Sequence, residues 1–343
     1  MTDFALDGFS VVTPTHGRAE SLQRVLDGLC RQDYPRDLLE VEVVVDGADE
    51  ETVRLLERPY PFRVGIHQQA KRGPAGARNR GLRHARAPFV LFLDDDVIPD
   101  VRLVSEHRRA HGAASDAVVI GPLLAPPGEG AAPWTRWEWS TLEEQYRAMT
   151  AGEWQPTPRQ FYTGNASVRR EHLVAVGGFD EAFRRGEDVE LAWRLHRLGL
   201  RFVFEPGAAG VHLARRSFRS WLAAAYEYGR TDVMLERGRT GDEIPSWVLR
   251  EFAGRHPQTR RLALAGLRHE WLVRAVRRAG EPVVRSAALL GGPSRGNHAC
   301  SALFTMTYWA GVADQLGDRR RLVERLSRAA ARPAAGLARP GAR

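Results

Sequence analysis

The chain has 343 residues, of which 43% are apolar and 27% charged, a composition that allows a buried core and excludes an intrinsically disordered or membrane-embedded chain. The formal net charge of +8 comes from arginine, because Lys71 is the only lysine. This bias has two interpretations: codon usage in a GC-rich genome, or attraction to an anionic partner such as nucleic acid, acidic lipid or a phosphorylated substrate.

Short apolar runs alternate with helical patterns from Phe9 to about Val97, which is typical of a parallel α/β sheet. Strands are predicted at residues 9–13, 41–45, 62–66 and 89–93, and helices at 22–29, 50–56 and 75–85. Ligands of such sheets bind at the carboxyl ends of the strands. Three strand ends are therefore expected to converge on one site: Thr13-Pro14-Thr15, Asp46-Gly47 and Asp94-Asp95-Asp96.

The second half of the chain is organised differently. Val118–Gly121 is predicted to be a further strand, and Ala125–Trp139, rich in Pro, Gly and Trp, to be a loop that forms either a mobile lid or a surface excursion. A helix is predicted from about Glu187 to Leu198, and the chain after His212 is mostly helical. The Ala/Arg/Pro/Gly tail from about Ala329 is expected to be disordered.

The acidic run within FLDDDVIPD, residues 92–100, has carboxylates at i and i+2 just past an apolar strand, so that two of them can point the same way. Adjacent carboxylates repel each other unless a cation neutralises them. A small set of hard oxygen ligands suits Mg²⁺ or Mn²⁺ bound together with substrate phosphates. The alternative is a solvated acidic turn, and the position at a strand end favours the metal.

Two further features could carry chemistry. Glu187 and Asp188 open a helix in GEDVEL, where they either complement the helix dipole or supply a general base for an acceptor hydroxyl. His212 follows a short apolar segment after a turn. A lone histidine is usually structural or exposed, but as a third protein ligand of the metal His212 is chemically sensible.

A series of motifs in order resembles the family-2 glycosyltransferases and their GT-A relatives over about Phe9 to Gly229. The motifs are VVTPTHGRAESLQRVLDGLCRQDYP, VVVDG, GPAGARNRG, FLDDD, TGNAS, GGFDEAF and GEDVELAWRLHRLG. Each motif is weak alone, but seven in order at plausible spacing are a strong signal. The resemblance implies a GT-A fold, a Rossmann-like, mostly parallel α/β sheet flanked by helices.

The resemblance also implies roles in donor binding. Thr13, Pro14, Thr15 and Asp46 match the positions that hold the nucleobase, with Asp46 placed to accept from a ring N–H, as in uracil. The segment that flanks ribose and diphosphate matches Arg18, Arg72, Arg78 and Asn79. The family positions that form the walls of the donor-sugar and acceptor pocket correspond here to Gly164, Asn165 and residues 177–180. One departure is that Asp46-Gly47-Ala48-Asp49 stands where many relatives have DDGS, so only one aspartate precedes the glycine.

The metal and the base follow from the same resemblance. Asp96 matches the principal metal ligand, Asp94 its partner in the DXD motif and His212 the distal ligand of Mn²⁺ or Mg²⁺, while Asp95 is expected to contact the ribose or the sugar instead. Asp188 matches the catalytic base of inverting members, with Glu187 beside it.

The sequence therefore predicts a GT-A domain over residues 1–230, with a nucleotide-sugar half to about residue 100 and an acceptor half after it, a helical region over 231–328 and a tail over 329–343. The predicted activity is metal-dependent transfer of a hexosyl group from a nucleotide sugar, UDP favoured, to an acceptor hydroxyl with inversion. A nucleotidyltransferase is the alternative enzyme, although TPTHGRAES lacks a Gly-rich phosphate loop. A non-catalytic nucleotide-sugar-binding protein is a second alternative. Nucleic acid is not expected as a partner, because the arginines are spread along the chain.

Cellular location and assembly are less closely determined by the sequence. Cys30 and Cys300 form no metal or disulfide pattern, and the N-terminus has no basic-then-apolar signal design, so a cytoplasmic protein is expected. The apolar stretch Ala299–Ala313 is shorter than the roughly 20 residues that span a bilayer, and a buried helix is expected there. Aromatic residues of the C-terminal helices leave three uses open: an acceptor platform, a homodimer face or a peripheral contact with the inner face of the membrane. The acceptor itself is a small molecule, a saccharide or a lipid-linked group.

Overall fold

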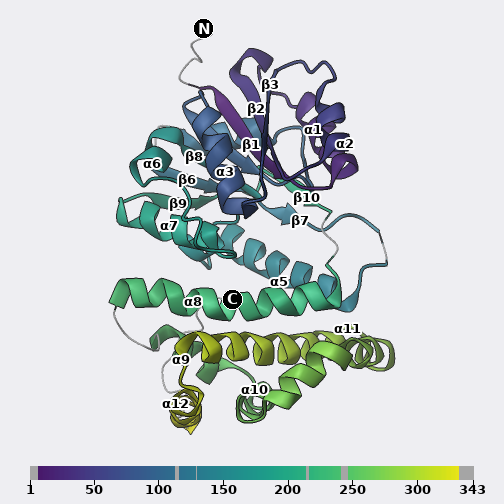
Figure 1. Ribbon diagram of the computed structural model, residues 1–343, viewed down its shortest axis with the longest axis vertical. Helices are drawn as coiled ribbons and strands as arrows, with labels where there is room; N and C mark the ends of the chain where they lie inside the picture. The colour runs from purple at the N-terminus through teal and green to yellow at the C-terminus, as the bar shows by residue number, and fades with distance from the viewer. Residues whose placement is uncertain (1–6, 113–115, 129, 214–215, 241–245, 332–343) are drawn as a thin grey trace. The chain divides into compact units, whose positions relative to one another are not determined.

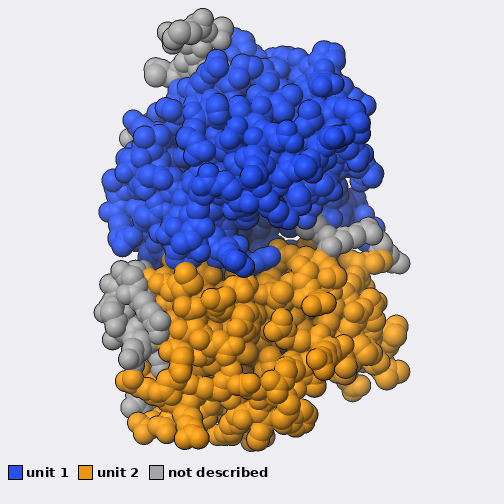
Figure 2. Space-filling model, in the orientation of Figure 1, with its two compact units in different colours: residues 1–128, 142–214 blue, residues 129–141, 215–343 orange. Residues whose placement is uncertain are grey.

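The computed structural model describes residues 7–112, 116–128, 130–213, 216–240 and 246–331 (Figure 1). The chain divides into two compact units, residues 1–128 with 142–214 and residues 129–141 with 215–343, which are coloured separately in Figure 2. The predicted division at residue 230 falls inside helix α8 (Phe218–Thr240). The whole of α8 belongs to the second unit, because it packs along helix α11 (Glu270–Leu316) of that unit.

A seven-stranded sheet in the order β3-β2-β1-β4-β8-β6-β9 forms the centre of the first unit. Its strands are β1 (Phe9–Thr15), β2 (Leu39–Asp46), β3 (Arg63–Gln69), β4 (Phe89–Leu93), β6 (Ala117–Ile120), β8 (Asn165–Arg169) and β9 (Arg201–Phe204). Helices of this unit are α1 (Ala19–Cys30), α2 (Glu50–Leu56), α3 (Gly73–His84), α4 (Leu103–His111), α6 (Arg170–Ala175) and α7 (Glu187–Arg197), with 3₁₀ turns η1 (Arg36–Leu38) and η2 (Pro158–Gln160). The predicted strands and helices are therefore present, with ends shifted by a few residues.

Strand β1 shows why these residues form a sheet with helices on both faces. Val11 and Val12 are both fully buried, but they enter different apolar clusters, Val11 with Leu22 of α1 and Val12 with Leu82 of α3. Both neighbours of β1 in the sheet, β2 and β4, run parallel to it. The carboxyl ends of the three strands therefore lie at one edge of the sheet, which confirms the predicted convergence.

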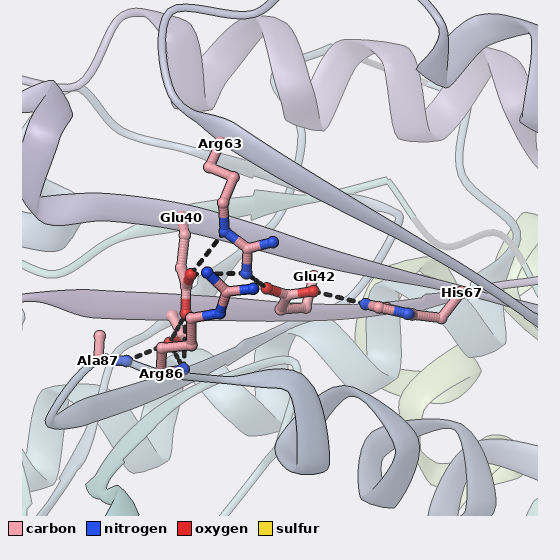
Figure 3. Close-up of polar contacts among 7 residues, drawn as sticks. Glu40, Glu42, Arg63, His67, Arg86 and Ala87 are labelled. Atoms are coloured by element: carbon pink, nitrogen blue, oxygen red, sulfur yellow. Dashed lines mark hydrogen bonds and ion pairs between the residues drawn. The ribbon is translucent and has the colours of Figure 1, made fainter. Parts of the chain in front are cut away.

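Two residues of β2 are exceptions to its apolar pattern, because Glu40 and Glu42 are acidic and yet fully buried. Glu40 accepts hydrogen bonds from the Arg63 guanidinium at 2.7 and 2.9 Å and from the Arg86 backbone N–H at 2.7 Å (Figure 3). Glu42 is paired with Arg63 as well and lies 2.5 Å from His67 Nε2. A buried carboxylate is tolerated only when it is paired, so this network joins β2, β3 and the segment after α3.

A small second sheet adds the last element of the site. It consists of β5 (Val97–Pro99), β7 (Leu123–Leu124) and β10 (Gly210–His212), with β10 antiparallel to β5 and parallel to β7. His212 lies opposite Val97 in this pairing. The small sheet thus brings His212 next to the segment that follows the acidic run, although the two are more than a hundred positions apart in sequence.

The predicted loop over Ala125–Trp139 is wrong in its second part, because helix α5 spans Pro133–Thr150. Its first turns lie in the second unit, where the Trp134 ring contacts Phe218 and the Trp137 ring contacts Trp221. Two tryptophans at i and i+3 share one helix face, and burial of that face outweighs the Pro- and Gly-rich composition just before it.

The second unit is helical, with α8, α9 (Ser246–Gly254), α10 (Pro257–Arg268), α11 and α12 (Arg319–Ala331). Helix α11 is interrupted at Gly292, whose φ of 68° and ψ of −173° are not helical, so it consists of two arms. The apolar stretch Ala299–Ala313 lies in the second arm and is mostly buried, as predicted. Among the described residues, no helix is long and apolar enough to cross a membrane. Of the predicted tail, residues 329–331 are the last turn of α12, and residues 332–343 lie outside the described part of the chain.

Candidate functional site

The acidic run after β4 is a turn rather than a continued strand. The Val97 backbone N–H donates to the Asp94 carbonyl at 3.1 Å. Arg18 Nη1 lies 3.0 Å from Asp95 and 2.7 Å from Asp96, so adjacent aspartates share one guanidinium. The expected alternation of i and i+2 is lost, because side chains alternate only along extended backbone.

Burial raises the pKa of Asp95 to about 6, against the attraction of Arg18. Burial also acts on Asp96, but its hydrogen bond to His212 and the charges of His212 and Arg18 hold the pKa of Asp96 below its ordinary value. At neutral pH both carboxylates are mainly ionised, and Arg18 partly neutralises them.

The small sheet places His212 beside the acidic turn. His212 Nε2 lies 3.4 Å from Asp96 Oδ1, and the Leu213 backbone N–H donates to the Asp96 carbonyl at 2.8 Å. In the part of the chain that the structure describes, no three His, Cys, Asp or Glu side chains gather closely enough to enclose a metal. The adjacent carboxylate and imidazole nevertheless fit Mn²⁺ or Mg²⁺ with open positions for phosphate oxygens.

Arg78 joins the acidic turn to helix α7. Its side chain is buried, with Nη2 at 2.7 Å from Asp94 Oδ1 and Nη1 at 2.9 Å from Glu187 Oε1. A guanidinium suits this position because it can bind two carboxylates in fixed directions. The two acidic motifs of the sequence are therefore held together by Arg78, which the resemblance had placed beside the ribose and diphosphate.

Asp188 follows Glu187 in the first turn of α7 and is partly exposed. Its Oδ1 accepts from the Val189 backbone N–H at 2.8 Å. Burial and then the negative charge of Glu187 raise the pKa of Asp188 to about 7, and Arg78 acts in the opposite direction. Of the two carboxylates in GED, Glu187 is used by the ion pair with Arg78, and Asp188 has a pKa near neutrality.

Asp46 has a structural role that the sequence reading did not include. Its Oδ1 accepts from Gln69 Nε2 and from the Arg72 backbone N–H, each at 2.8 Å, and its Oδ2 accepts from the Gly73 backbone N–H at 2.8 Å. The Arg72 and Gly73 backbone N–H groups lie at the beginning of α3, where such groups lack helical partners. Asp46 therefore holds in place the helix that carries Arg78, and contact with a nucleobase would use its remaining lone pairs.

The other two residues predicted to flank the diphosphate contact the GGFDE loop. Asn79 Oδ1 accepts from the Phe179 backbone N–H at 2.8 Å, and its Nδ2 donates to the Phe179 carbonyl at 2.9 Å. Arg72 Nη2 lies 2.6 Å from Glu181 Oε2. Gly178 approaches so closely that a Cβ would lie 2.6 Å from Asn79 Oδ1. No local pattern indicated these contacts between segments a hundred residues apart.

The predicted nucleobase turn is only partly accessible. Thr13 is fully buried and Thr15 is 3% exposed, whereas Pro14 is half-buried. Within the described residues the Thr13 hydroxyl has no hydrogen-bond partner. A base at this edge would first meet Pro14.

Gly164 and Asn165 lie in different surroundings. The Gly164 carbonyl accepts from the Asp94 backbone N–H at 3.3 Å, and a Cβ on Gly164 would lie 3.1 Å from Asp94 Oδ2. The Asn165 side chain is fully buried, with Nδ2 at 2.7 Å from the Ala208 carbonyl and Oδ1 at 2.9 Å from His107 Nε2. Gly164 therefore lies against the acidic turn, while the Asn165 side chain binds interior groups. His107, buried on α4, was missed by sequence reasoning.

Comparison with known proteins gives consistent similarities. The family model described as Glycosyl transferase family 2 matches residues 10–177. The pre-mycofactocin glycosyltransferase of Mycobacterium tuberculosis is 30% identical over 283 residues, which are 78% of this chain and 58% of that protein. The validoxylamine A glucosyltransferase of Streptomyces hygroscopicus subsp. jinggangensis is 34% identical over 225 residues, 56% of this chain and 52% of that protein. The chain thus spans just over half the length of these curated relatives.

A solved structure with a similar fold is the mannosyltransferase PcManGT from Pyrobaculum calidifontis in complex with GDP-Man and Mn²⁺. The TM-score is 0.57 and the sequence identity 21%, over 89% of this chain and 86% of that one. At this identity the likeness concerns the fold, and it confirms the predicted GT-A-like sheet with flanking helices.

Proposed function

The chain belongs to glycosyl transferase family 2, and we propose that it transfers a sugar from a nucleotide-sugar donor to an acceptor hydroxyl, with inversion at the anomeric carbon. The observation that carries this proposal is the position of Asp188. It has a pKa of about 7 and lies next to Glu187, which Arg78 joins to Asp94 of the acidic turn. A carboxylate with a pKa near 7, as a general base needs, therefore lies next to a residue that is joined to the acidic turn proposed to bind the donor diphosphate.

In the proposed reaction Asp188 accepts the proton of the acceptor hydroxyl while that oxygen forms its bond to the anomeric carbon. The bond from the anomeric carbon to the diphosphate breaks, and the diphosphate leaves with the bonding electron pair. Attack from the side opposite to the leaving group inverts the configuration. Glu187 forms an ion pair with Arg78 and is given a positioning role in this scheme. Asp188 is therefore its single base.

Asp96 and His212 would hold Mn²⁺ or Mg²⁺. Asp94, the other expected ligand, is paired through Oδ1 with Arg78 and does not gather with them into a three-residue site within the described part of the chain, so it would join only after leaving that ion pair. When bound, the cation supplies charge stabilisation for the departing diphosphate. Support for a cation comes from the donor set and from the fold relative, which was solved with GDP-Man and Mn²⁺.

Arg18 supplies a positive charge at the same place. Its side chain is 54% exposed, although it pairs with the buried Asp95 and Asp96. We assign it to the diphosphate when a cation takes over the neutralisation of Asp96, since arginine binds phosphate oxygens in two directions. We favour a UDP-hexose as the donor on the family resemblance, in which Asp46 matches the residue that accepts from a ring N–H, as in uracil.

The proposal is tested first by thermal shift with UDP-, GDP- and dTDP-sugars, each with and without Mn²⁺. We expect one donor class to stabilise the protein more with Mn²⁺ than without it, and His212→Ala to remove the metal-dependent part. Absence of metal-dependent stabilisation by every donor would contradict the proposed donor site.

A second experiment addresses the reaction itself. Slow hydrolysis of the selected donor, followed by NMR, distinguishes an enzyme from a protein that only binds nucleotide sugars. Incubation with candidate acceptors and a donor of known anomeric configuration then gives the stereochemistry. A product of retained configuration would remove the base role from Asp188 while leaving donor binding intact.

A further inference from the structure

The first arm of α11, residues 270–291, has an outer face that is unusually apolar for an exposed surface. Trp271 is 59% exposed, and Leu289 and Leu290 are 83% and 85% exposed. Leu289 lies 18 positions after Trp271, which at 3.6 residues per turn is five full turns, so the two share one side of the helix. We define this side as the α11 outer face.

The opposite side of the same arm is buried, which fixes the rotation of the helix. Val273 is 7% exposed and Val284 is fully buried. Gly280 approaches α8 so closely that a Cβ would lie 3.0 Å from the Phe218 ring. The arm therefore already packs one side against the rest of its unit, and the apolar residues of the outer face lie on the other, solvent-exposed side.

Arginines lie between the apolar ends of the α11 outer face. Residues 270–291 contain four arginines and two glutamates. Arg274 and Arg285 are 66% and 52% exposed and pair with Glu270 and Glu281 one turn away, and the Arg285 guanidinium also lies over the Trp134 ring at 5.1 Å from its centroid. Arg278, on the same face, is also exposed. The face thus combines a net positive charge with a tryptophan at one end and a leucine pair at the other.

The leucine pair lies where the arm ends. The backbone leaves the helix at Gly292, and Pro293 begins the second arm. The side chains of Leu289 and Leu290 therefore stand at the turn between two helical arms. An apolar tip of this kind can enter the boundary between headgroups and acyl chains without unfolding any of the helix.

We propose that the α11 outer face docks on the surface of an anionic phospholipid bilayer. The arginines would meet lipid phosphates, Trp271 would lie at the headgroup level, and the leucine pair would enter the acyl boundary. A second copy of the chain is the less suitable occupant, because a twofold contact through this face would bring its own arginines together.

The test is co-sedimentation of the full chain with vesicles of phosphatidylcholine alone and of phosphatidylcholine mixed with phosphatidylglycerol. Binding to the mixed vesicles, and weak binding to the neutral ones, is the expected result. The double substitution Leu289→Ser with Leu290→Ser should lower the affinity for mixed vesicles about tenfold or more. The pair Arg274→Gln with Arg278→Gln should lower it and flatten its dependence on salt.

A matched control is Val174→Ser, which changes an apolar residue that is 55% exposed on α6 of the first unit. It should leave vesicle binding unchanged. Both leucines are almost fully exposed, so their variant should keep the circular dichroism spectrum and the melting temperature of the parent chain. Equal binding of the parent to neutral and anionic vesicles, or full binding by the leucine variant, would overturn the proposal. If the parent chain did not bind vesicles but formed dimers in light scattering, and the leucine substitutions made it monomeric, the face would instead be assigned to a second copy.

Discussion

Replacement of Asp188 by asparagine should remove activity and stabilise the fold, a combination that separates a catalytic from a structural carboxylate. Asparagine keeps the Oδ1 that accepts from the Val189 backbone N–H. It lacks the negative charge that lies beside Glu187 and that burial disfavours. Loss of the general base should lower kcat by about 10²-fold to 10⁴-fold.

The magnitude of the stability change follows from the pKa of Asp188. Raising it from 3.8 to about 7 corresponds to roughly 4 kcal/mol between the acid and the carboxylate, at 1.36 kcal/mol for each pKa unit. Partial exposure of the side chain reduces this to about 2 kcal/mol. Because the folded pKa is raised, the parent chain loses this stability as the pH rises from 3.8 to about 7, and the loss is complete above that range.

Unfolding of the parent and of Asp188→Asn in denaturant should therefore diverge as the pH rises from about 4 to about 7 and stay apart above that, with the variant more stable at the higher pH. The matched control is Glu190→Gln on the same helix, which removes an ion pair with Arg194 and should cost about 0.3 to 0.5 kcal/mol without affecting kcat. A variant less stable than the parent at pH 8 would refute the reasoning about burial. Undiminished kcat would refute the base role.

Three further outcomes are expected. The rate of transfer should fall about tenfold for each pH unit below 7, because protonated Asp188 cannot accept a proton, and a rate independent of pH from about 5 to 8 would contradict this. Glu40→Gln should lower the free energy of unfolding by about 2 to 4 kcal/mol, since it removes a buried carboxylate from a guanidinium; an unchanged midpoint in urea would contradict the pairing. Gly178→Ala should destabilise more than Gly177→Ala in thermal unfolding. Both glycines have positive φ, but only at Gly178 would the added carbon lie 2.6 Å from Asn79 Oδ1, and equal losses would mean that this contact relaxes.

Local patterns predicted most of the first unit. Alternation of apolar strands with helical periodicity is a property of neighbouring residues, and parallel strands bring their carboxyl ends to one edge whatever the details of packing. The positions of Asp96 at a strand end and of Asp188 at a helix start could therefore be predicted. Helix α5 could not, because its first turns depend on a buried face formed with distant residues such as Trp221.

The partners of the charged side chains were decided by tertiary structure alone. Arg78 meets Glu187 across 109 positions of sequence, and Asp46 accepts from the beginning of α3 across 27. A carboxylate motif has the same local sequence whether it caps a helix, pairs with arginine or faces a ligand, and burial and distance select among these. The arginine-rich composition had left an anionic partner open, and only the packing of α11 shows which residues of that helix face outward. The sequence thus determined the order of elements and the candidate carboxylates, while packing decided which of them are held in ion pairs and which remain free to act, because charge pairing depends on distances that no local pattern contains.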